Sequence, residues 1–236
     1  MAISRTPLDL SRGFLWTAGV RTFVHYSDRV PRNGALVVAS NHRSFMDAFA
    51  LMDAIDRPVR FACHHYMGQV PLMRDLVERL GCFPLDEPDR RQQSFLRQGM
   101  ELLQQGEAVG VFPEGAMPMV TPTRRDRAGE FHRGFAHLAL KASQLDVAVL
   151  PIAIVSDKET TYDSVPVRWL SLFDPTEPLF DRPGSHPMVL YRRLTVRIGR
   201  PYWITVSDRR DYRGKNAREA VDRLVDRTRA EILALL

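Results

Sequence analysis

Short apolar runs alternate with longer amphipathic stretches along most of the chain. The short runs are nearly continuous in apolar residues, which is typical of strands buried on both faces of a parallel sheet. They predict strands at 35–39, 59–62, 81–85, 108–112, 147–155 and 194–198. The longer stretches repeat apolar residues with helical spacing. They predict helices at 44–55, 70–80, 91–105, 134–143 and 216–236. This alternation predicts an α/β fold with a largely parallel sheet, covered by helices on both faces.

Three stretches depart from the alternation. Residues 8–27 carry a ragged apolar face and predict an N-terminal helix. Residues 116–132 combine prolines with arginines and predict an irregular basic loop, and 156–187, with five prolines, predicts mostly loop. Since no stretch resembles an interdomain linker, we expect a single domain over 1–236. In that domain a helical segment at 1–30 precedes an α/β core at 31–236.

Composition narrows the class of protein. The chain has 236 residues, of which 44% are hydrophobic and 26% charged, as in ordinary globular domains. Its two cysteines exclude a disulfide framework and a multi-cysteine metal site, and we expect neither a metal nor a cofactor. No apolar run reaches the length of a membrane span, and the first residues lack a signal-peptide pattern. We therefore expect a cytoplasmic location.

The net charge of the chain suits several classes of anionic partner. The net charge is +5, and all but three of the 33 basic residues are arginine. Such an excess suits nucleic acid, an anionic membrane surface or phosphate-bearing ligands. The aromatic and basic stripe of single-strand binders is missing, so we expect no nucleic-acid partner. The stretch 8–27, with Phe14, Leu15, Trp16 and Phe23, fits a helix packed on its own domain, and it also fits a helix lying on a membrane.

The densest polar cluster follows a predicted strand and precedes a predicted helix. It consists of Asn41, His42, Arg43 and Ser44, with Asp47 five residues after the histidine. Ligands of open α/β sheets bind beyond the carboxyl ends of strands. With His42 in the loop and Asp47 in the first helical turn, the carboxylate can reach the ring and fix its tautomer. The second ring nitrogen is then free to take a proton from a hydroxyl.

A structural interpretation of the same residues stands beside the catalytic one. Ser44 and Asp47 fit the capping-box pattern, in which the serine caps the helix and the acid closes the box. Asp47 would then stabilise the helix by up to about 1 kcal/mol, and His42 would be an ordinary loop residue. The segment alone does not choose between these alternatives.

Three further places carry candidate chemistry. Glu114 and Gly115 follow the predicted strand 108–112, at a turn that either binds a ligand or only joins two elements. Arg90 and Arg91 lie at the start of one predicted helix, and Arg133 lies at the start of the next. Arginines beside the free N–H groups of a helix start can bind an anion, and the alternative is solvated surface charge.

Four sequence blocks occur in a fixed order along the chain. They are Asn41-His42 with Asp47, Phe112-Pro113-Glu114-Gly115, Phe131-x-Arg133-Gly134 and Val149-Leu150-Pro151-Ile152. In order and rough spacing, over about residues 33–155, these blocks resemble the glycerolipid acyltransferases, also called H-x4-D or lysophospholipid acyltransferases. The late segment 197–201 resembles the family's late strand.

The resemblance implies an activity and roles for the candidate residues. It implies transfer of a fatty acyl group from acyl-CoA or acyl carrier protein to a hydroxyl, on an α/β sandwich that membrane-docking helices often precede. His42 is implied as the general base, Asp47 as its orienting partner, and Glu114 with Gly115 as shaping the acceptor pocket. No acyl-enzyme is implied, because the hydroxyl attacks the thioester directly while a donor such as a backbone N–H holds the oxyanion. We place Asn41, Ser44, Arg90, Arg91 and Arg133 among the candidate substrate-binding residues.

The chain departs from the family pattern where the acceptor phosphate binds. Ala116-Met117-Pro118 follows the Glu-Gly pair where many members have Thr-Arg-Ser, and the arginines of the second block are displaced to Arg90 and Arg91. In the family those arginines help to bind the phosphate. The expected acceptor is a lysophospholipid such as 1-acylglycerol-3-phosphate, and the alternative is a non-phosphorylated lipid alcohol or a glycolipid.

The expected partners follow from that activity. They are acyl-CoA or acyl carrier protein, a lipid acceptor, and the inner face of the membrane, where the protein binds peripherally. Two rival functions are a catalytically inactive lipid- or acyl-carrier-binding protein on the same fold and a basic nucleic-acid-binding domain. The intact His42 and Asp47 pair argues against the first, and the missing recognition motif argues against the second.

Overall fold

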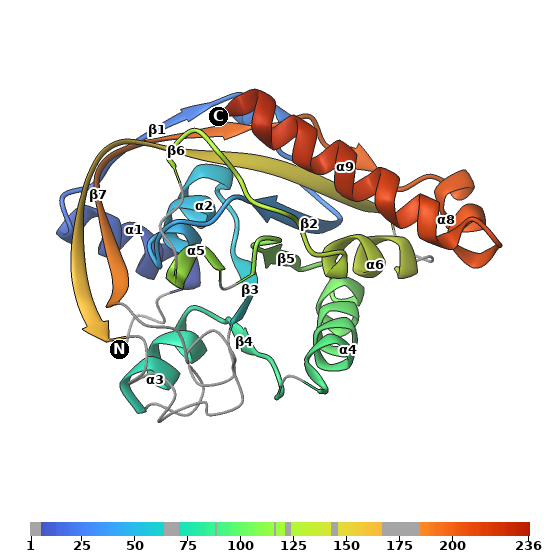
Figure 1. Cartoon of the computed structure of the whole chain (residues 1–236), viewed down its shortest axis with the longest axis horizontal. Helices are drawn as coiled ribbons and strands as arrows, with labels where there is room; N and C mark the ends of the chain where they lie inside the picture. The colour runs from blue at the N-terminus through green and yellow to red at the C-terminus, as the bar shows by residue number, and fades with distance from the viewer. Residues whose placement is uncertain are drawn as a thin grey trace.

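A computed structural model of the chain shows an eight-stranded sheet with helices on both faces (Figure 1). The structure describes residues 6–63, 71–87, 89–115, 117–120, 124–142, 146–166 and 185–236. The strands are β1 (Arg21–His25), β2 (Ala35–Ser40), β3 (Val59–Cys63), β4 (Phe83–Pro84), β5 (Ala108–Val111), β6 (Val147–Pro166), β7 (Ser185–Ile198) and β8 (Tyr202–Trp203). The helices are α1 (Pro7–Thr17), α2 (Asp47–Ile55), α3 (Pro71–Arg79), α4 (Arg91–Gln104), α5 (Met117–Val120), α6 (Gly134–Lys141), α8 (Val206–Arg213) and α9 (Ala217–Leu235), with a 3-10 turn η1 (Ser27–Arg29).

The strands lie in the order β1-β7-β6-β2-β5-β3-β4, and β8 pairs with β6. Neighbouring strands run parallel, except that β6 runs antiparallel to β7 and to β8. The predicted α/β fold with a largely parallel sheet is therefore confirmed. Its central strand β2 is buried along its whole length, because helices cover both faces of the sheet.

Successive residues of β2 point into two separate cores. Leu36 and Val38 pack into the core beneath α1 and α2, whereas Val37 and Ala39 pack into the core beneath α4, α6 and α9. This division follows from the alternation of side chains along a strand. In Figure 1, α9 runs along the sheet and α1 lies at the opposite end of the molecule from α8.

The N-terminal segment differs from the single helix predicted for 8–27. A capping box between Thr6 and Asp9 starts α1, with proline at its first position, and α1 ends before Gly19. Gly19 has a φ of +67°, a left-handed conformation that suits glycine. The chain then enters β1, which pairs in parallel with β7. The prediction for 21–25 is wrong because pairing with a distant strand outweighs the local helical pattern.

The long antiparallel pair of β6 and β7 also differs from the prediction. Residues 156–166 were expected in a loop, yet β6 continues to Pro166 and pairs with β7 from Ser185 to Ile198. Pro166 and Pro187 lie at the outer end of this pair, where a missing backbone donor costs least. The remaining prolines of the predicted loop lie outside the described residues.

Two smaller differences from the prediction remain. Helix α2 begins at Asp47 rather than Ser44, so the residues 41–46 form a loop. The short elements α5, α8 and β8 were not predicted from the sequence. Of the segment 116–118, Ala116 lies outside the described residues, as do residues 143–145 at the end of one predicted helix. None of the described helices has the length and apolar character that crossing a bilayer requires.

Candidate active site

His42 and Asp47 meet in the loop that follows β2. The Nδ1 atom of His42 lies 2.8 Å from an Asp47 carboxylate oxygen, Oδ2. The loop turns back on the first residue of α2, which brings together two side chains that a continuous helix would hold apart. The arrangement expected from the sequence is therefore present. It fixes the proton on Nδ1 when the ring is neutral and leaves Nε2 as the nitrogen available to a hydroxyl.

The Asp47 carboxylate is fully buried and accepts hydrogen bonds from four donors. Oδ2 accepts from the ring of His42 and from the backbone N–H groups of Arg43 (2.7 Å) and Ser44 (2.9 Å). Oδ1 accepts from the hydroxyl of Tyr191 at 2.7 Å. Four hydrogen bonds replace the water that this carboxylate has lost, which is the condition for burying a charge.

Only one of the two hydrogen bonds of the capping-box alternative is formed. The Asp47 carboxylate accepts the Ser44 backbone N–H, but the Ser44 hydroxyl accepts from Met46 at 3.1 Å and donates to the Val189 carbonyl at 2.6 Å. The helix begins at Asp47 itself. Asp47 thus organises the loop and orients the histidine with the same carboxylate.

Glu114 supports the backbone of the same loop. Its Oε1 accepts the backbone N–H of His42 at 3.0 Å, and its Oε2 accepts the backbone N–H of Gly129 at 2.6 Å. Gly115 follows with a φ of +65°, and a Cβ there would lie 3.2 Å from the ring of His132. The Glu-Gly turn at the end of β5 therefore joins the histidine loop to the segment around Gly129.

Asn41 fastens the loop to β6. Its side-chain amide donates to the Ile154 carbonyl at 2.9 Å and accepts from the Ile154 N–H at 2.8 Å. Asn41 and Ser44 are each 1% exposed. Their side-chain polar atoms thus bond to the main chain of β6, β7 and the loop itself.

The three candidate arginines lie apart from this cluster in their described contacts. Arg90 immediately precedes α4, is mostly exposed and lies 3.7 Å from Asp89. Arg91 is the first residue of α4. Arg133 immediately precedes α6 and pairs with Asp222 of α9 at 2.9 Å, with half of its side chain exposed. Their expected contact with an acceptor phosphate stays a prediction.

The structure adds residues to the site that the sequence did not identify. Besides Tyr191, the side chain of Glu159 on β6 lies 2.8 Å from Arg43 and 3.1 Å from Arg125, and only 6% of the glutamate side chain is exposed. Arg125 is half-exposed. Tyr191 and Glu159 come from segments remote in sequence from His42, and no local pattern around either residue marked it as part of the site.

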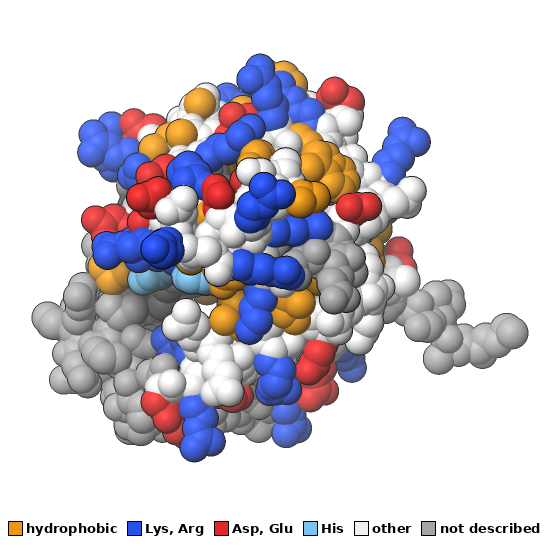
Figure 2. Space-filling model, turned by 90° about the vertical axis from the view of Figure 1, so that its right-hand side faces the viewer, with side chains coloured by type: hydrophobic (Ala, Val, Ile, Leu, Met, Phe, Trp, Pro, Cys, Tyr) orange, Lys and Arg blue, Asp and Glu red, His pale blue; other side chains and the backbone are white. Residues whose placement is uncertain are grey.

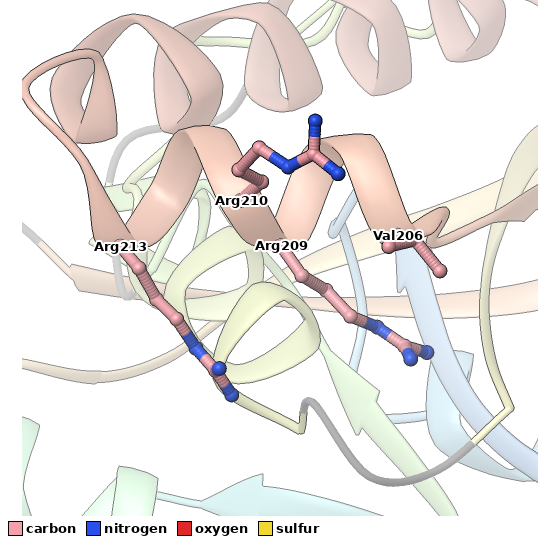
Figure 3. Close-up of a pocket in the computed structure, with 4 residues that line it drawn as sticks. All are labelled: Val206, Arg209, Arg210 and Arg213. Atoms are coloured by element: carbon pink, nitrogen blue, oxygen red, sulfur yellow. The ribbon is translucent and has the colours of Figure 1, made fainter.

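A hollow of about 440 Å³ lies elsewhere on the molecule, lined by Val206, Arg209, Arg210 and Arg213 of α8 (Figure 3). In Figure 3, Arg209 and Arg213 point to one side of the helix and Arg210 to the other. This helix follows β8, which pairs with the first residues of β6, whereas His42 follows the last residue of β2. The helix α8 thus begins near the amino-terminal ends of β2 and β6, whereas His42 lies beyond the carboxyl end of β2. Figure 2, turned toward the side of α4, α6 and α8, shows Lys and Arg spread across that face.

Comparison with known proteins identifies the family. The family model of the acyltransferases matches residues 21–155, which is more than half of the chain. A chloroplastic 1-acyl-sn-glycerol-3-phosphate acyltransferase of Arabidopsis thaliana is 32% identical over 120 residues, covering 50% of this chain and 31% of the relative. The 1-acyl-sn-glycerol-3-phosphate acyltransferase of Borreliella burgdorferi is 22% identical over 172 residues, covering 71% and 64% respectively. The chain thus spans less than two thirds of the length of each relative.

A solved structure shares the fold. The 1-acyl-sn-glycerophosphate acyltransferase PlsC of Thermotoga maritima superposes with a TM-score of 0.58 at 18% identity, covering 95% of this chain and 77% of that one. The region that the family model matches contains the His42 loop and the turn at Glu114. The chain belongs to the acyltransferase family.

Proposed function

We propose that this protein transfers a fatty acyl group from a thioester donor to the hydroxyl of a lysophospholipid, with 1-acylglycerol-3-phosphate as the first acceptor to test. The observation that carries the proposal is the 2.8 Å contact between His42 Nδ1 and Asp47 in a loop beyond the end of β2. The names of the relatives from Arabidopsis thaliana and Borreliella burgdorferi support this choice of acceptor.

The reaction needs one proton to move twice. His42 Nε2 takes the proton of the acceptor hydroxyl as its oxygen attacks the thioester carbonyl carbon, and Asp47 stabilises the imidazolium that forms. The tetrahedral intermediate collapses by breaking the carbon–sulfur bond. The departing thiolate then takes the proton from His42, which leaves an ester, a free thiol and the original enzyme. In this scheme the intermediate's oxyanion binds a donor such as a backbone N–H.

This direct route needs no cysteine nucleophile. Burial raises the pKa of Cys63 to about 12 and that of Cys82 to about 11, so both remain thiols near neutral pH. Neither a metal nor a cofactor takes part in the proposed reaction. The acyl donor is either acyl-CoA or acyl carrier protein.

The acceptor phosphate is proposed to bind arginine. Arg90, Arg91 and Arg133 are the candidates from the sequence, and Arg125 joins them because its half-exposed guanidinium lies beside Glu159, the partner of Arg43. The segment that follows Gly115 has no arginine before Arg124. This departure keeps a non-phosphorylated lipid alcohol or a glycolipid as the second candidate acceptor.

Peripheral binding to the inner face of the membrane is proposed as the way to reach a lipid acceptor. Of the four apolar residues expected on the membrane, Leu15 is buried and Phe14 stacks on Phe49 with 4.3 Å between the ring centroids. Trp16 is 81% exposed and Phe23 is 42% exposed. The proposed contact with lipid therefore narrows to Trp16 on α1 and Phe23 on β1.

One assay tests the activity against its rivals. Radiolabelled acyl-CoA and acyl carrier protein are each incubated with 1-acylglycerol-3-phosphate, other lysophospholipids, a lipid alcohol and a glycolipid, using the wild type and His42→Ala. We expect a product that depends on His42 with a phosphorylated acceptor. Binding of acceptor without product in every combination would favour the inactive lipid-binding alternative instead.

A further inference from the structure

The loop that carries His42 is held by the antiparallel pair β6 and β7, which comes from a distant part of the sequence. Val189 and Tyr191 are two apart on β7, so both side chains leave the same face of the strand. The Val189 carbonyl accepts the Ser44 hydroxyl, and the Tyr191 hydroxyl reaches Asp47. On β6, Ile154 bonds to Asn41 and Glu159 to Arg43. These contacts reach both sides of His42.

Tyr191 makes the one contact of this set that ends on the carboxylate itself. Its hydroxyl lies 2.7 Å from Oδ1, while the ring of His42 and two backbone amides share Oδ2. Three donors fix the position of Oδ2. The Tyr191 hydroxyl, which bonds to Oδ1, then determines how the plane of the carboxylate is turned relative to the imidazole. A hydrogen bond to a carboxylate is strong and directional, and it serves this purpose well.

The tyrosine is itself buried in the core of the protein. Tyr191 is 1% exposed, and its ring lies in the core beneath α1 and α2. Burial and the neighbouring Asp47 raise the pKa of Tyr191 well above 10. The hydroxyl therefore keeps its proton and acts as a donor at any pH at which the enzyme would work.

We propose that Tyr191 is a positioning residue that sets the orientation of Asp47, and through it the tautomer and orientation of His42. The expected effect on kcat rests on the proposed acyl transfer, whereas the expected effect on the tautomer of His42 does not. Tyr191 touches neither reacting atom, and it acts through the carboxylate alone.

The test compares Tyr191→Phe with Tyr212→Phe. Both changes remove a single hydroxyl, and the Tyr212 hydroxyl lies 3.1 Å from His137 Nδ1 on α6, away from the His42 loop. For Tyr191→Phe we expect kcat to fall about tenfold with an unchanged KM for the acceptor, since one hydrogen bond to a carboxylate is lost. For Tyr212→Phe we expect wild-type kcat. An equal loss of kcat in both variants, or none in folded Tyr191→Phe, overturns the inference.

A second readout does not depend on turnover. Nitrogen NMR of the imidazole rings, with the His42 signals assigned from a His42→Gln spectrum, reports the tautomer of the neutral ring. We expect the Nδ1–H form in the wild type and in Tyr212→Phe, and a growing share of the Nε2–H form in Tyr191→Phe. If the wild type transfers no acyl group but Tyr191→Phe still shows this change of tautomer, the positioning role would be supported and the proposed function contradicted. An unchanged tautomer in folded Tyr191→Phe would overturn the positioning role.

Two further experiments cover a structural role and a folding defect. In an Asp47→Asn background, Tyr191→Phe should cost no further kcat, because its effect passes through the carboxylate; a loss that simply adds would overturn the inference. If Tyr191→Phe does not fold, 3-fluorotyrosine can be placed at position 191 alone. This residue keeps the aromatic ring, and its hydroxyl is a stronger hydrogen-bond donor than that of tyrosine. The His42 ring signals should then shift while those of the remaining histidines do not, and unshifted His42 signals would count against the inference.

Discussion

The ring of His42 stacks on the ring of Phe112, with 4.0 Å between the centroids and 13° between the planes. Phe112 stacks in turn on Phe61, with 5.2 Å between the centroids. Since Asp47 holds one edge of the imidazole and Phe112 covers one face, two independent contacts fix its orientation. In the proposed reaction, a ring held in this orientation would need little reordering before it accepts a proton, and such pre-organisation lowers the entropic part of a catalytic barrier.

The first prediction concerns this pair. His42→Ala should lower kcat at least about 100-fold, because the proposed general base is lost. Asp47→Asn should be comparably severe, since an amide can hold the ring in the wrong tautomer, and it should also cost about 1–3 kcal/mol of stability by weakening a fully bonded buried group. Steady-state kinetics on proteins shown to be folded by thermal unfolding check both. Near-normal turnover of folded His42→Ala would reject the mechanism.

The second prediction concerns the acceptor phosphate. Replacement of Arg90, Arg91, Arg125 or Arg133 by alanine should raise the KM of a phosphorylated acceptor, and leave a neutral lipid alcohol unaffected, if that guanidinium binds the phosphate. For Arg133 the chain offers a matched control. Asp222→Asn breaks the same half-exposed ion pair but keeps the arginine, at a cost of no more than about 1 kcal/mol in stability.

For Arg133 the two variants distinguish a role in phosphate binding from a role in packing. A raised KM in Arg133→Ala together with a normal KM in Asp222→Asn would assign Arg133 to the phosphate. Equal effects of the two would assign it to the packing of α6 against α9. If all four alanine variants used both acceptors like the wild type, the phosphate-binding role of these arginines would be wrong.

The third prediction concerns membrane association. Trp16→Ala should weaken binding to vesicles with anionic lipid by about tenfold, because part of an indole ring no longer enters the interface. Trp203→Ala, at a half-exposed tryptophan of β8, is the matched control and should bind like the wild type. Vesicle sedimentation at low and high salt provides the measurement, and binding should weaken as salt rises. Failure of the wild type to sediment at low salt would contradict membrane binding, and wild-type binding by Trp16→Ala would place the lipid contact elsewhere.

The fourth prediction concerns stability at alkaline pH. The folded protein keeps protons on Cys63, Cys82 and Tyr191 that the unfolded chain releases, because all three pKa values are raised by burial. The free energy of unfolding should therefore fall as pH rises above about 9, by up to about 1.4 kcal/mol per pH unit for each retained proton. Urea unfolding at pH 7, 9 and 10.5 measures the effect. The double variant Cys63→Ala, Cys82→Ala should lose less stability over that range, and an equal loss would contradict the assignment to the thiols.

The elements that the sequence predicts well are those with a local pattern. The buried strands around Val38, Val109 and Val149 are continuous in apolar residues, and the amphipathic helices between them are long enough to be recognised. The segment 21–25 was assigned to a helix because its partner, β7, is remote in the sequence. The local pattern of a segment does not show which distant segment it pairs with. For the same reason, the sequence did not predict the outer part of the β6 and β7 pair.

The site divides in the same way. His42 and Asp47 are five residues apart, and their meeting could be foreseen from a loop followed by a helix start. Tyr191 and Glu159 reach the same loop from β7 and β6, and only the folded sheet brings them there. The candidate arginines were predicted from their positions at helix starts, and the structure places them at the starts of α4 and α6. Their proposed contact with a phosphate is not a property of either helix start alone.

The pairing of β1 with β7 has a consequence for how the chain is made. The ribosome delivers β1 before β2, but its partner strand emerges only after β2 to β6 have been synthesised. The strand β1 therefore cannot pair with β7 until the strands between them have been synthesised. Pairings between strands that are distant in the sequence form slowly. In a nascent chain that stops before β7, the backbone N–H and C=O groups of β1 that pair with β7 in the folded protein therefore lack their partners.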